Sequence, residues 1–477
     1  MKIKHTIVAS GIAAMLLPCV PLLADEMQDI RNEIKSMKES YESRTKALED
    51  RLKEAEGKAS QAQESAQKAE ASATKAETTA KEAASAPVAR PPATANGFNP
   101  AMSLILSGAY ANLSKDPTTW RLGGFQTGDG IGPGDRGFNL GESELTFSAS
   151  VDHLFYGNLT YSVDRKGQGS VEEAFFRTTG LSNGFTVKGG RFFSGIGYLN
   201  EVHAHAWDFV DQPLAYQAFL GGQLAQEGIQ AKWLAPTPLF LEFGLEAGRG
   251  AEFPGVFRNK NGVAAGAGFV HLGGDVGVSN SWRGGLSYLH HAPKDRGFVD
   301  TDSGGIGVTD SFNGKSNLWI ADFIWKWSPN GNPINTNFKF QAEYFHRKEN
   351  GDLTFDTAAA SPFGTQVGDF SSAQSGFYLQ GVYQFLPQWR VGLRYDQLSS
   401  GTTNIGLVDS GTLTADDFSI FKKYNPKRAT LMFDWNPSEF TRIRLQYAHD
   451  KSRPDASDNQ LFLQYIYSLG THGAHKF

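Results

Sequence analysis

From Phe98 onward, apolar and polar residues alternate with a period of two in one short run after another. In the stretch 338–344, aromatic and alanine side chains occupy every second position, and a lysine, a glutamine and a glutamate lie between them. Successive side chains of a β-strand point to opposite faces, so this pattern predicts strands with one apolar and one polar face. Such strands form a sheet whose two faces meet different environments.

Roughly sixteen runs of this kind follow one another along the chain. They lie near residues 101–111, 140–151, 154–164, 170–180, 185–194, 225–234, 239–249, 263–278, 281–291, 315–328, 334–348, 372–386, 388–398, 425–435, 438–449 and 459–470. An even number of antiparallel strands is typical of bacterial outer-membrane barrels.

The connections between the runs alternate between longer and shorter. The first spans 112–139, the second is only Asp152 and His153, and the fifth spans 194–224. Further long loops are expected at 292–314, 349–371 and 399–424, with short turns around 328–333, 387 and 436–437. Outer-membrane barrels combine long extracellular loops with short periplasmic turns and keep both termini in the periplasm.

Residues 98–477 are therefore predicted to form an all-β transmembrane antiparallel barrel of about 16 strands. After the N-terminal leader, no stretch offers the 18 consecutive apolar residues of a membrane helix. A secreted β-sandwich or propeller also explains the alternation. It does not explain the loop asymmetry, or the apolar face that recurs from Leu461 to Leu469 in the last run.

Residues 1–24 are typical of a secretory signal peptide. Lys2 and Lys4 precede an apolar stretch that ends at Leu17. The single cysteine, Cys19, raises lipidation as an alternative, but Pro18 stands where a lipidation motif has a small residue. Removal of the leader leaves no thiol, which excludes disulfides and cysteine-ligated metals.

Residues 25–85 are predicted to form a periplasmic coiled coil. An apolar stripe runs through Met27, Ile30, Ile34, Met37 and Tyr41 with the alternating three- and four-residue steps of a helical seam. Alanines continue the stripe to position 83, and they bury little area, so a lone charged helix or a disordered spacer is the alternative. A Pro-rich linker at 86–97 ends the helix.

Three segments resemble a group of bacterial outer-membrane proteins related to phosphate-selective and other trimeric porins. They are Phe98–Pro100, the stretch from Gly190 through Asn200 to Phe209, and the ending Leu469–Phe477. The resemblance implies a sixteen-stranded barrel that assembles as a homotrimer, and it leaves the solute open. Some relatives are labelled as TonB-dependent-like, which implies a second candidate function.

These observations predict a porin in the bacterial outer membrane that allows passive diffusion of small hydrophilic solutes, with anions as a candidate class. The alternatives are a receptor or uptake protein for a metal or other ligand, and a barrel that tethers the cell wall. We expect no enzyme activity, no cofactor and no nucleic-acid partner. The expected partners are outer-membrane lipid and further copies of the chain, with peptidoglycan as a candidate partner of the coiled coil.

Five arginines are predicted to line the pore and set its selectivity. If the apolar residues of the last strands face lipid, Arg390, Arg394, Arg428, Arg442 and Arg444 all face the lumen. Guanidinium groups attract phosphate and carboxylate groups. In the alternative reading, they pair with acidic lumen residues such as Glu142, Glu144 and Asp322.

The loop 194–224 is the candidate constriction of the pore. It carries His203, His205, Asp208 and Asp211. A His-x-His pair beside carboxylates can bind a transition metal. In an extended segment, however, side chains at i and i+2 share a face for geometric reasons alone. We therefore expect these residues to form hydrogen bonds or line the pore, and we expect no metal site.

Overall fold

A computed structural model describes residues 100–150 and 152–470, together with seven positions between Lys35 and Lys53. The chain divides into two compact units, Met1–Gly97 and Phe98–Phe477. The seven described positions of the first unit are helical and exposed. The signal peptide at 1–24, the linker at 86–97 and most of the predicted coiled coil at 25–85 lie outside the described residues.

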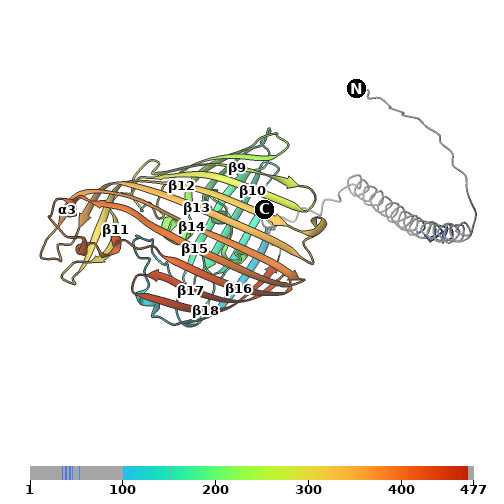
Figure 1. Cartoon of the computed structure of the whole chain (residues 1–477). Helices are drawn as coiled ribbons and strands as arrows, with labels where there is room; N and C mark the ends of the chain where they lie inside the picture. Colours follow the sequence, from blue (N-terminus) through green and yellow to red (C-terminus); the bar gives the residue numbers. More distant parts are fainter. Residues whose placement is uncertain are drawn as a thin grey trace, which may run out of the picture. The chain divides into compact units, whose positions relative to one another are not determined.

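The second unit is a single antiparallel sheet that closes on itself, because β1 pairs with β18. Its strands are β1 (Ala101–Leu113), β2 (Gly137–Leu140), β3 (Ser143–Ser150), β4 (Phe155–Val163), β5 (Gly169–Thr178), β6 (Phe185–Phe193), β7 (Ala225–Leu234), β8 (Phe240–Gly248), β9 (Ala265–Val276), β10 (Asn280–His291), β11 (Arg296–Thr301), β12 (Gly307–Trp327), β13 (Asn337–Phe355), β14 (Gln366–Leu386), β15 (Trp389–Ile405), β16 (Lys427–Ser438), β17 (Thr441–Arg453) and β18 (Ala456–Gly470). Consecutive strands lie side by side around the barrel (Figure 1).

The wall has sixteen strands, because two of them are interrupted. Both β2 and β3 pair with β1, and both β10 and β11 pair with β12. The first interruption falls at Gly141, where an added Cβ would lie 2.1 Å from Ser107 Oγ. The predicted closed antiparallel barrel of about 16 strands is confirmed.

Four strands are longer than the sequence indicated. The regions 292–314, 349–371 and 399–424 were expected to be loops, yet β12 begins at Gly307, β13 continues to Phe355, β14 begins at Gln366 and β15 continues to Ile405. The outer parts of these strands bury an apolar cluster of their own, which makes an extended sheet stable beyond the barrel wall. This outward extension, which includes β11 and α3 (Gly406–Asp409), projects from one end of the barrel (Figure 1).

The two ends of the barrel differ in their connections. At the end that carries the outward extension, the connections include the long segments 114–136, 194–224 and 249–264. The connection between β17 and β18, at the same end, is only Pro454 and Asp455. We call this the long-loop end. At the other end, the short-turn end, the longest connection is 328–336.

The outer face of the barrel is apolar and carries aromatic side chains near both ends. At the short-turn end these rings contact one another across strands, as in the stacked pairs Phe185 with Trp233 and Trp389 with Trp435. Leucines such as Leu393 and Leu445 are exposed on the wall. Tyr288 and Trp319 form a second contact towards the long-loop end. Among the described residues, no helix has the length and hydropathy to cross a membrane.

Candidate functional site in the barrel lumen

The connection between β6 and β7, residues 194–224, packs against the inner wall of the barrel, and we call it the inserted loop. It contains the short 3-10 helices Leu199–Glu201 and Ala204–Ala206 and the helix α2 (Leu214–Leu220). All seven residues of α2 are buried. Its packing partners include Phe269 and Phe345 on distant strands and Phe125 in the connection 114–136, and these contacts fix the loop in the lumen.

A buried carboxylate anchors the start of the inserted loop. Glu343 on β13 accepts hydrogen bonds from the backbone N–H groups of Tyr198 at 3.0 Å and Leu199 at 3.1 Å. The Tyr216 hydroxyl donates to the same carboxylate at 2.9 Å, and the Tyr378 hydroxyl donates to it at 2.5 Å. Four donors converge on this one buried side chain, which makes it a geometrically defined anchor.

An aromatic core holds α2 in place. The Phe219 ring stacks on Phe345 of β13 with 5.9 Å between ring centroids, and it meets Phe125 edge-on at 5.8 Å. Phe219 and Phe345 are fully buried, and Leu214, Tyr216 and Leu220 extend the same cluster. The middle of the lumen is therefore filled by packed side chains, and any solute must pass beside this core.

The five arginines predicted to line the pore all point inward, on β15, β16 and β17. Arg394 and Arg428 share Asp211 of the inserted loop, where Arg394 Nη2 lies 2.9 Å from Oδ1 and Arg428 Nη1 lies 2.5 Å from Oδ2. Asp396 of β15 neighbours both guanidinium groups, with Arg394 Nε at 3.0 Å. These pairs tie the loop to the wall.

The other three arginines surround Asp434 of β16. Arg444 Nε lies 2.8 Å from its Oδ1, and Arg442 Nε lies 3.9 Å from its Oδ2. Arg390 bridges Asp434 and Asp208 of the inserted loop, with Nη1 3.3 Å from Asp208 Oδ1. Arg444 and Arg442 also donate to the backbone oxygen of Trp207, at 2.8 and 3.2 Å.

The carboxylates that face these arginines differ from those expected. Glu142, Glu144 and Asp322 have other neighbours, and the observed partners are Asp208, Asp211, Asp396 and Asp434. Asp396 and Asp434 could have been found from strand parity, because Asp396 shares a face with Arg394 and Asp434 shares one with Arg428. The pairing of Lys339 with Asp208 had no signal in the sequence, since it depends on where the loop folds.

The two loop aspartates are ionised in this setting. Burial alone would raise the pKa of Asp208, but Lys339 and Arg390 beside it hold that pKa below its ordinary value. Burial likewise opposes ionisation of Asp211, and Arg428 and Arg394 overcome it and lower its pKa to about 2. Each aspartate is thus a fixed negative charge between cationic groups.

His203 and His205 lie in a second cluster, on the side of the lumen formed by β3 and β5. His203 Nδ1 lies 3.2 Å from Glu144 Oε2 and 3.3 Å from Glu172 Oε2, and its Nε2 lies 3.1 Å from Glu173 Oε2. His205 Nδ1 lies 2.8 Å from Glu144 Oε1. We call these five residues the histidine–glutamate cluster. Burial alone would lower the pKa of His203, but the three carboxylates raise it well above its ordinary value.

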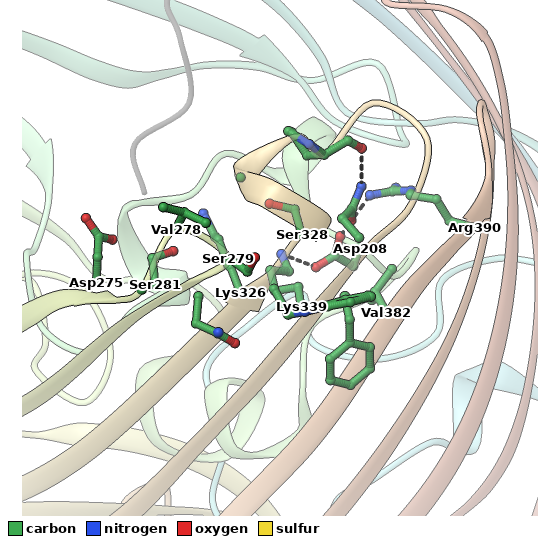
Figure 2. Close-up of a pocket in the computed structure, with 17 residues that line it drawn as sticks. Asp208, Asp275, Val278, Ser279, Ser281, Lys326, Ser328, Lys339, Val382 and Arg390 are labelled. Atoms are coloured by element: carbon green, nitrogen blue, oxygen red, sulfur yellow. Dashed lines mark hydrogen bonds and ion pairs between the residues drawn. The ribbon is translucent and has the colours of Figure 1, made fainter. Parts of the chain in front are cut away.

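A cavity of about 740 Å³ opens at the short-turn end of the lumen. Lys326, Lys339 and Arg390 line it together with Asp208 and Asp275. Figure 2 shows Lys339 and Arg390 converging on Asp208 from different strands. Lys326 and Lys339 are register partners on β12 and β13, so two ammonium groups stand side by side at this mouth.

No protein-family model matches the chain. It is 30% identical over 372 residues to an uncharacterized protein of Aquifex aeolicus (strain VF5), across 72% of this chain and 70% of that protein.

Solved structures give more distant likenesses. They include the outer membrane channel DcaP of Acinetobacter baumannii at 14% identity and TM-score 0.46, covering 78% of this chain and 97% of that one. They also include an anion-selective porin of Comamonas acidovorans at 10% identity and TM-score 0.43, covering 78% and 99%. By its sequence, the chain belongs to the same family as the Aquifex aeolicus protein.

Proposed function

We propose that this protein is an outer-membrane channel for the passive diffusion of small hydrophilic solutes, with a modest preference for anions. The apolar wall with aromatic rings towards both ends supports a position in a lipid bilayer. The long-loop end would then face the outside of the cell, and the short-turn end would face the periplasm.

The observation that carries the proposal is the charged interior of a barrel with an apolar exterior. Burying a charged side chain costs free energy unless an opposite charge or a hydrogen-bonding group lies beside it. Here Lys339 and the five arginines of β15 to β17 face the carboxylates of Asp208, Asp211, Asp396 and Asp434. Asp450 of β17 also faces Arg428, and six cationic groups against five carboxylates favour an anion in this part of the lumen.

The inserted loop limits the size of the solute. The α2 core narrows the middle of the lumen, and the cavity of about 740 Å³ lies on its short-turn side. This arrangement supports a narrow path beside the loop for small anions. The ammonium pair Lys326 and Lys339 would attract the anion at the periplasmic mouth.

For assembly, we propose a homotrimer whose residues 25–85 form a periplasmic coiled coil, with peptidoglycan as its candidate partner. The proposal rests on the heptad stripe from Met27 to Tyr41 and on the family resemblance of the sequence. Light scattering of the detergent-solubilised full chain, compared with a variant lacking residues 25–97, tests it. A monomer for the full chain would contradict it.

Permeation into proteoliposomes tests the channel directly. The full chain is reconstituted, and the entry of a neutral sugar of pentose size is compared with the entry of a carboxylate anion and an amine cation of similar size. We expect all three to enter, the anion fastest. Liposomes prepared with heat-denatured protein are the control. Entry rates equal to that control for every solute would rule out a channel and favour a closed receptor.

A further inference from the structure

The histidine–glutamate cluster has the donor atoms of a metal site. One oxygen each from Glu144 and Glu172 and one ring nitrogen of His203 all lie within 4.8 Å of one another. They come from β3, β5 and the inserted loop, so the three donors meet only because the loop is folded into the lumen. The side chain of His203 is 23% exposed and that of Glu144 is 2% exposed. The donors are therefore shielded but still reachable from the lumen.

Two of the three spacings among these donors fit tetrahedral coordination. Zinc binds histidine nitrogen and carboxylate oxygen at about 2.0 to 2.2 Å, which places neighbouring ligands of a tetrahedron roughly 3.3 Å apart. His203 Nδ1 lies 3.2 Å from Glu144 Oε2 and 3.3 Å from Glu172 Oε2. The oxygens of Glu144 and Glu172 lie within 4.8 Å of each other, and the two carboxylates would close around a metal ion beside His203.

The remaining atoms of the cluster form the outer hydrogen bonds of a metal site. A ligating histidine usually donates its second ring N–H to a carboxylate, and ligating carboxylates are themselves hydrogen-bonded. His203 Nε2 lies 3.1 Å from Glu173 Oε2, and His205 Nδ1 lies 2.8 Å from the second oxygen of Glu144. Both the histidine and one carboxylate are thus held in orientation from outside the donor set.

The cluster contains more acceptors than its histidines can satisfy. Glu142 lies beside Glu144 and Glu172, so a fourth carboxyl group adjoins the cluster. Glu142 Oε1 is also buried and has no hydrogen-bond partner among the described residues. A divalent cation would compensate this concentration of carboxyl groups.

A β-bulge builds the site. Thr160 of β4 pairs with Glu173 of β5, and Tyr161 pairs with Val171, so Glu172 is the extra residue between them. Without the bulge, Glu172 and Glu173 would face opposite sides of the wall. Bulges of this kind re-aim side chains and are frequent beside functional sites. Here the bulge turns two consecutive carboxylates towards His203.

We propose that Glu144, Glu172 and His203 bind a divalent transition metal of the zinc class, with Glu173 and His205 as orienting residues. Mixed imidazole and carboxylate donors favour this class over magnesium or calcium, which prefer oxygen ligands alone. Three protein donors leave a fourth position for water or a solute. The proposal goes beyond the channel function and departs from the sequence-based expectation of no metal site, because the sequence did not reveal the bulge.

Zinc binding to the full chain in detergent tests the proposal, and it does not depend on whether the pore conducts. The protein is prepared without a histidine tag and stripped with a chelator, and Zn²⁺ is titrated in competition with a chromophoric chelator. We expect one site per chain that is weakened at least roughly tenfold in His203→Gln and in Glu172→Gln, as for lost ligands or their hydrogen-bond partners. X-ray absorption should show nitrogen and oxygen ligands, including imidazole, near 2.0 to 2.2 Å.

His449→Ala is the matched control, since His449 lies on the outer face and contacts Asn459. It should bind zinc as the unmodified chain does, and His472 and His475 contribute equally to every variant. Retained β-sheet circular dichroism shows that each variant is folded. Unchanged affinity in both His203→Gln and Glu172→Gln, or an X-ray absorption spectrum without imidazole, would overturn the proposal. Either result would favour a cluster without metal, in which His203 is protonated and held by the three carboxylates.

Discussion

Arg394 of the barrel wall and Asp211 of the inserted loop form a two-point contact. Arg394 Nη2 lies 2.9 Å from Asp211 Oδ1, and Arg394 Nη1 donates to the backbone oxygen of Asp211 at 2.7 Å. The Arg394 side chain is 1% exposed. The contact therefore holds both the side chain and the backbone of the loop against β15, and its loss would leave Asp211 buried with only Arg428 as an ionic partner.

Arg394→Gln should lower the free energy of unfolding by roughly 3 to 5 kcal/mol, the usual cost of removing one partner from a buried ion pair. The exposed pair Arg121 and Asp455, at 2.8 Å, is the matched control. Arg121→Gln should cost about 0 to 1 kcal/mol, because solvent screens that pair. Urea unfolding in detergent micelles measures both. Equal costs for the two variants would show that the buried contact does not stabilise the loop.

Phe219→Ala should both destabilise the loop and widen the path beside it. Removing a buried aromatic side chain typically costs about 3 to 5 kcal/mol and leaves a cavity. The cavity would lie between Phe345 and Phe125, in the middle of the lumen. Single-channel conductance should increase. Phe363→Ala, at an exposed ring in the connection 356–365, is the control and should conduct as the unmodified chain does. A Phe219→Ala channel with unchanged conductance and stability would mean that α2 does not limit the pore.

The outward extension should become less stable as the pH rises from acidic to neutral. Asp310 lies nine residues beyond Trp319, roughly 30 Å along the strand. Its side chain is fully buried, and Oδ2 has no hydrogen-bond partner among the described residues. Burial, together with the nearby carboxylates of Asp300 and Asp356, raises the pKa of Asp310 from 3.8 to about 7.

A raised carboxyl pKa means that the folded state binds the proton more tightly than the unfolded state. The contribution of Asp310 to the free energy of unfolding is therefore fully present below pH 3.8. It is lost progressively as the pH rises towards about 7. Hydrogen exchange of the extension, corrected for its intrinsic pH dependence, should be at least roughly tenfold faster at pH 8 than at pH 5. Asp310→Asn should remove this difference, and Asp129→Asn, at an exposed loop position, should keep it. A difference that persists in Asp310→Asn would assign it to another group.

The sequence predicted the barrel because alternation and loop asymmetry are local patterns. The same patterns placed Arg394 and Arg444 on the inner wall, since parity along one strand is enough. They could not show that Asp211 would meet Arg394, because that contact depends on how the inserted loop folds. They also could not show the bulge at Glu172, which changes the parity of β5 and brings Glu173 to His203. The outer parts of β12 to β15 were expected to be loops because their burial comes from packing against one another.

The most direct test of the proposed function is the zero-current potential of the channel in a planar bilayer under a tenfold gradient of potassium chloride. We expect a modest anion preference, which the double variant Lys326→Gln with Lys339→Gln shifts towards cations. These residues provide the ammonium pair at the short-turn end. Lys260→Gln, at an exposed loop position, should leave the potential unchanged. Cation preference in the unmodified chain, or a potential that the double variant does not move, would contradict the proposed anion preference.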